Sequence, residues 1–98
     1  MGFLNSMRTI GEINRLLKDF ENQVTITQGQ LDSGASKVTL NNSLNVMKSI
    51  HQQLIDKFGN SSGARTATYT IFGDKMRMDA ILTYTRNVIL NLNAIINA

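Results

Sequence analysis

The chain has 98 residues and a net charge of +3, which is enough sequence for one domain over residues 1–98 and no more. Its hydrophobic fraction of 42% excludes a disordered chain, and the absence of cysteine excludes disulfides, thiolate nucleophiles and cysteine metal sites. No stretch approaches the ~20 consecutive apolar residues of a membrane-spanning helix and no secretory signal is evident, so we expect a cytoplasmic protein without a transmembrane segment.

The first part of the chain predicts an amphipathic helix over residues 4–28. Its apolar residues recur at seven-residue steps with others between them: Phe3, Ile10, Leu17 and Val24, then Ile13 and Phe20. Such a stripe is typical of a helix that packs one face on a core. Acidic and basic residues alternate on the other face and predict exposed ion pairs within the helix. Residues 24–27 are β-branched and alternating, which also fits a strand.

A second helix is predicted from Thr39 or Asn41 to Gly59, after a glycine- and serine-containing connection. Apolar residues again fall at helical spacing along this segment. We expect Gly59 to adopt the left-handed conformation just past the helix end, where glycine is favoured.

Residues 66–72 are ambiguous, because threonine at every second position indicates a strand while Tyr69 and Phe72 also fit a helical face. We favour a helix, because a strand would need a partner strand and the only candidate segments are residues 24–27 and 37–40. The last helix is predicted to follow Asp74, acting as its cap, and to run to Ile96.

These elements predict an all-α fold, a small antiparallel bundle of three helices, or of four, with short connections. The alternative is an α+β fold with a short hairpin or strand around residues 24–40 and 66–72.

His51 is the one histidine, and it lies between Met47 and Leu54 on the apolar side of the second helix. A zinc site needs three or four ligands, and the chain offers no second histidine and no cysteine. We interpret His51 as a packed histidine with one hydrogen-bonded nitrogen. No acid–base pair or nucleotide-binding loop is evident, so we expect no enzyme, no catalytic residue, no metal and no cofactor.

The last helix points to a function. Its polar face carries asparagine and threonine but only one charge, Arg86, whereas a helix facing water usually carries more. We therefore expect a non-enzymatic interaction module that binds another protein, most simply a second copy of itself. The predicted interface consists of apolar residues from the first and last helices: Ile10, Ile13, Leu17, Phe20, Val88, Ile89, Leu90 and Leu92.

Two alternatives remain open. A nucleic-acid accessory protein would contact phosphates through four basic residues: Arg65, Lys75, Arg77 and Arg86. A membrane-surface protein would use the amphipathic residues 2–20, and Met1, Gly2 and Ser6 also match a weak acylation pattern. For residues 2–20 we favour a helix packed on the core.

Overall fold

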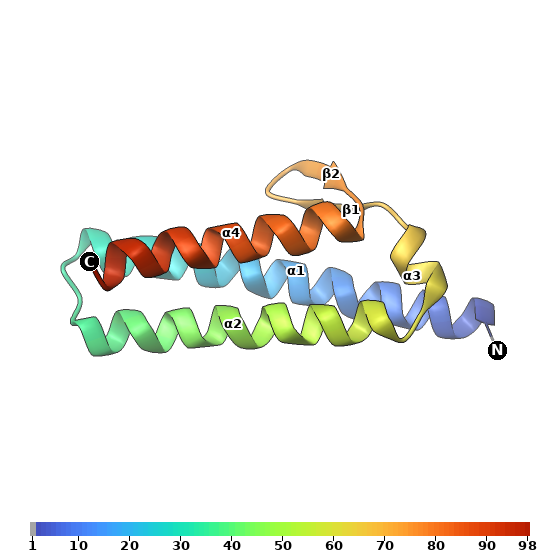
Figure 1. The fold of residues 1–98 in the computed structure, drawn as a ribbon, viewed down its shortest axis with the longest axis horizontal. Helices are drawn as coiled ribbons and strands as arrows, with labels where there is room; N and C mark the ends of the chain where they lie inside the picture. The colour runs from blue at the N-terminus through green and yellow to red at the C-terminus, as the bar shows by residue number, and fades with distance from the viewer. Residues whose placement is uncertain (1) are drawn as a thin grey trace.

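Three long helices run along a rod of 48 × 21 × 17 Å in the computed structural model, which describes residues 2–98 (Figure 1). They are α1 (Gly2–Asp32), α2 (Lys37–Gly59) and α4 (Met78–Ile96). The connection from α2 to α4 holds a short helix, α3 (Ser62–Thr66), and a hairpin of β1 (Tyr69–Ile71) and β2 (Asp74–Met76). Because α2 runs antiparallel to α1 and α4, the predicted antiparallel helical bundle is confirmed, with four helices and a two-stranded sheet.

The first helix continues through residues 24–27, so the predicted alternative of a strand around residues 24–40 is wrong. Val24 and Thr27 are buried against the core, which outweighs their weak preference for strands. The hydroxyl of Thr27 donates to the Gln23 carbonyl at 2.7 Å, and that of Thr25 donates to the Glu21 carbonyl at 3.1 Å. Threonine is accommodated in a helix through this bond to the preceding turn.

The ends of α2 differ from the prediction. The helix begins at Lys37, because the Ser36 hydroxyl caps it by accepting from the Thr39 N–H at 3.1 Å. Gly59 lies inside the helix, and the cap after it is Asn60 with φ −94°, so the left-handed position predicted for Gly59 is wrong. Arg65 satisfies the free carbonyls there, donating to Phe58 O at 2.8 Å and Gly59 O at 3.3 Å.

The hairpin corrects the favoured helical interpretation of residues 66–72. Tyr69 pairs with Met76 and Ile71 with Asp74, so the strand's partner is the segment after the turn and neither of the two segments considered. Asp74 consequently lies in β2, and Arg77 stands before α4 without a side-chain cap.

The turn of the hairpin consists of Phe72 and Gly73, with φ of 49° and 82°. Positive φ at both positions characterises a type I′ turn, which favours asparagine followed by glycine. Glycine adopts this conformation without strain, whereas a bulky residue such as Phe72 is held there at a cost of about 1–3 kcal/mol. The N–H of Phe72 donates to a carboxylate oxygen of Glu21 at 2.6 Å, which ties the turn to α1.

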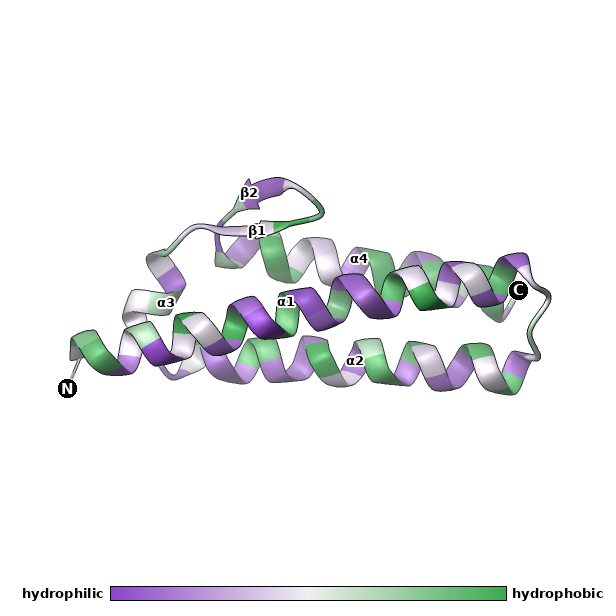
Figure 2. Ribbon diagram, turned by 180° about the vertical axis from the view of Figure 1, so that it is seen from behind, coloured by the Kyte–Doolittle hydropathy of each residue, from purple (hydrophilic) through white to green (hydrophobic). Residues whose placement is uncertain are grey.

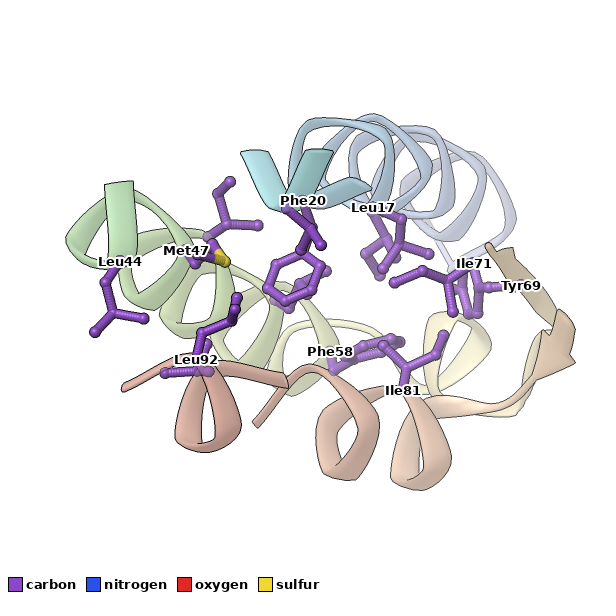
Figure 3. Close-up of a cluster of buried hydrophobic side chains, with 14 of the residues drawn as sticks. Leu17, Phe20, Leu44, Met47, Phe58, Tyr69, Ile71, Ile81 and Leu92 are labelled. Carbon is purple, nitrogen blue, oxygen red and sulfur yellow. The ribbon is translucent and has the colours of Figure 1, made fainter. Parts of the chain in front are cut away.

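Viewed end-on, the core is enclosed on four sides (Figure 3). Three sides are α1, α2 and α4, and the hairpin forms the fourth, opposite α2, with Tyr69 and Ile71 pointing inward. Tyr69 contacts Phe58 edge to face, with ring centroids 5.6 Å apart, and its hydroxyl donates to Ala64 O at 2.8 Å. The hairpin covers only the first half of α4, so the fourth side is incomplete beyond Phe72 (Figure 1).

The ion pairs predicted within the first helix are not formed. Glu12 instead pairs with Lys57 of α2 at 3.0 Å, and this is the only ion pair within residues 2–98. The antiparallel packing of α1 on α2 places Lys57 closer to Glu12 than the intrahelical arginines.

Candidate interaction surfaces

The predicted interface residues divide according to burial. Ile13, Leu17 and Phe20 of α1 are at most 1% exposed, and Ile89 and Leu92 of α4 are below 10%. These five side chains contact the chain's own core, because the heptad stripes are used to close the bundle. Ile10 and Val88 are half-buried, and Leu90 is 55% exposed. Leu90 is therefore the member of the set that presents most surface to a partner.

Around Leu90 the outer face of α4 carries little charge. Thr83, Asn87, Leu90 and Ala94 are all exposed and follow each other at steps of four, three and four residues, so they form one stripe. We call these four residues the outer stripe of α4. Arg86 is the only charged residue between Ala80 and Ala98; it is exposed and lies one helical turn before Leu90, at the edge of the stripe. The sequence predicted this polar face with its low charge, and the fold leaves it exposed.

A groove opens where the hairpin stops covering the fourth side. We call it the α1–α4 groove; its volume is about 500 Å³, and it is lined by Val24, Gln28, Phe72, Tyr84, Val88, Asn91 and Leu92. The rings of Phe72 and Tyr84 meet edge to face at its hairpin end, with centroids 6.2 Å apart and planes at 63°. No carboxylate, lysine or arginine lines it. Sequence reasoning missed this groove, because its residues come from three separate elements.

His51 lines a smaller groove between α2 and α4, of about 320 Å³, together with Ile55, Leu82, Thr83 and Arg86. His51 Nδ1 lies 2.8 Å from the Thr85 hydroxyl oxygen, and Thr85 donates its one proton to the Ile81 carbonyl at 2.9 Å. His51 Nδ1 is therefore the donor, and Nε2 is the unprotonated nitrogen of a neutral ring. The predicted packed histidine with one hydrogen-bonded nitrogen is confirmed. Burial, and then the charge of Arg86, lower the pKa of His51 from its ordinary value.

This lowered pKa predicts a stability that depends on pH. The unfolded chain binds a proton at His51 more readily than the folded chain does, so the contribution of neutral His51 is fully present above about pH 6.5. It is lost as the pH falls through the lower pKa of the folded state. Urea unfolding of the parent at about pH 5 and pH 7.5 should show lower stability at the acidic pH. His51→Gln, which keeps a donor but does not titrate, should reduce this difference; an unchanged difference would assign the pH dependence to other groups.

The four basic residues do not share one role. Arg65 donates to the carbonyls at the end of α2, and Arg86 lines the groove with His51. Lys75 lies in β2 and Arg77 just before α4. Because α2 and the hairpin flank α4 on opposite sides, Arg86 and Lys75 belong to different sides of the molecule (Figure 3).

The start of α1 is apolar and exposed, so the core-packed helix favoured for residues 2–20 is wrong for its first two turns. Phe3, Leu4 and Met7 are 76%, 73% and 55% exposed, and the apolar end is visible in Figure 2. Here α1 runs past the end of α2, and Ser6 bonds to Ser61 beside α3, with their hydroxyl oxygens 3.0 Å apart. The core begins only at Ile13. Met1 of the acylation pattern lies outside the described residues.

Comparison of the chain with protein-family models, with curated proteins and with solved structures finds no match. Within residues 2–98, no helix combines the length and apolar character that a membrane crossing requires. The same residues contain no cluster of three or more histidine, aspartate or glutamate side chains that would hold a metal ion.

Proposed function

We propose that this chain is a non-enzymatic interaction module that self-associates through the outer stripe of α4. The observation that carries the proposal is an exposed helix face centred on Leu90, whose one charge is Arg86, in a bundle where most of the predicted interface residues are buried in the core. In a two-fold dimer the same patch is used by both copies, so residues near the axis lie beside their own equivalents. A patch with many like charges would repel its copy there, whereas this face carries only Arg86.

The chemistry of the stripe suits a helix pair. Burial of Leu90 removes apolar surface from water, and full burial of a leucine contributes about 1.5–3 kcal/mol. The amide of Asn87 and the hydroxyl of Thr83 both donate and accept, so each can bond to an identical group across the axis. Ala94 is small enough to let two helices approach to the usual interaxial distance of about 8–10 Å.

The membrane-surface and nucleic-acid alternatives have weaker support. The exposed Phe3 and Leu4 suit an interfacial anchor, but the first 30 residues carry three basic and three acidic side chains and no net charge that would attract anionic lipids. For nucleic acid, Arg65 is engaged in capping α2, and Lys75 and Arg86 lie on different sides.

Molar mass by size-exclusion chromatography with light scattering tests the proposal. We expect the parent to run as a dimer and Leu90→Asp as a monomer with an unchanged helical circular dichroism signal, because the substitution places two carboxylates at the centre of the interface. The matched control is Val38→Asp: Val38 is 71% exposed in the first turn of α2, where an acidic residue is favourable, and this variant should remain a dimer. A monomeric parent, or a Leu90→Asp protein of parental mass, would contradict the proposal.

A further inference from the structure

The α1–α4 groove has the dimensions of a small-molecule site. Its volume of about 500 Å³ falls within the range of about 300–1,000 Å³ that is usual for ligand pockets. Helices α1 and α4 form its walls, and the turn of the hairpin closes one end. Because the hairpin occupies part of the fourth side, a helix from another chain would not fit along the whole length of the bundle there.

The lining defines the chemistry of a ligand. Val24, Val88 and Leu92 supply an apolar surface, and Gln28 and Asn91 line the groove from opposite walls. An amide can both donate and accept a hydrogen bond, so these two groups can orient a polar substituent. With no carboxylate, lysine or arginine in the lining, an ionised ligand would lose hydration without gaining a counter-charge.

The strained turn gives an independent reason to place a ligand here. Phe72 has a φ of 49° in a position that favours asparagine, and the residue stays 41% exposed, so burial in the core does not account for a phenylalanine there. The bond from its N–H to Glu21 and the edge contact with Tyr84 fix the ring at the mouth of the groove. Strained residues that are held this firmly cluster at binding sites.

We propose that the α1–α4 groove binds a small uncharged molecule that contains an aromatic ring. The ring packs against Phe72 and Tyr84, and a polar substituent reaches Gln28 and Asn91. This site is separate from the outer stripe of α4, since Leu90 does not line it. Ligand binding and self-association can therefore succeed or fail independently.

The test uses N-phenyl-1-naphthylamine, a neutral aromatic probe that fluoresces in apolar surroundings. We expect it to bind the parent, and Phe72→Asn to weaken binding about three- to tenfold, the effect of losing one aromatic contact. The same variant should unfold at a higher urea concentration than the parent, because asparagine tolerates the left-handed turn. A purely structural role for Phe72 would not combine weaker binding with a more stable fold.

Two further variants and one spectrum complete the test. Phe3→Asn makes the same substitution at an exposed phenylalanine outside the groove and should leave binding unchanged, while Val88→Phe should weaken it by filling the groove. In NMR spectra of the parent, the side-chain amides of Gln28 and Asn91 should shift on addition of the probe. The proposal would be overturned if neither Phe72→Asn nor Val88→Phe affected binding, or if the NMR shifts were confined to the groove at His51. It would also be overturned if binding weakened as the protein concentration rose, because a second copy of the chain would then occupy the groove.

Discussion

Phe58→Ala should lower the free energy of unfolding by about 3–5 kcal/mol, as measured by urea denaturation. The ring is 1% exposed and lies where α2 faces the hairpin, with the Tyr69 ring 5.6 Å away. Removing it leaves a cavity that is difficult to collapse, because the Phe58 carbonyl is held by Arg65 and the Tyr69 hydroxyl is held by Ala64. Since small domains are stable by only about 5–15 kcal/mol, this loss would consume much of the total.

Phe3→Ala is the matched control for this prediction. It deletes the same atoms from a helix, but Phe3 is 76% exposed, so the change in unfolding free energy should stay within about 0.5 kcal/mol. A similar loss for both variants would show that the first turns of α1 are packed on the bundle, contrary to the observed exposure.

Gly63→Ala should destabilise the fold by about 1–3 kcal/mol, although it adds a single methyl group to a short helix. A Cβ atom at residue 63 would lie 2.7 Å from the Cβ of Ser6, which is closer than two non-bonded carbon atoms can approach. The added methyl group would push α3 away from α1 and strain the bond between Ser6 and Ser61. Thermal or urea unfolding followed by circular dichroism measures the effect.

Ser6→Gly tests the cause through a double-mutant cycle. Alone it should destabilise by about 1 kcal/mol, because glycine disfavours the helix and the bond to Ser61 is lost. Combined with Gly63→Ala it should make space for the new methyl group, so that the double variant is more stable than the sum of the two single effects implies. Simple additivity would mean that residues 6 and 63 are not in contact.

Much of the fold follows from local sequence pattern. A helix repeats about every 3.6 residues, so the spacing of Ile13, Leu17 and Phe20 identified the buried face of α1 without knowledge of its partner. The place of His51 on the apolar side of α2 likewise predicted a packed ring with one bonded nitrogen, and the structure supplies Thr85 as its partner. These are properties of a single helix, which is why the sequence determined them.

Which apolar side chains are buried and where a groove forms were decided by the tertiary structure, because both depend on which element packs against each helix face. Phe3 falls on the same stripe as Leu17, yet it is exposed because α1 extends past its neighbour. The apolar stripes of the first and last helices predicted an interface with a partner, but only the packing shows that most of these side chains are buried within one chain. The α1–α4 groove exists because the hairpin turns back at Phe72 before covering the fourth side, and a pattern along one segment carries no information about where another segment ends.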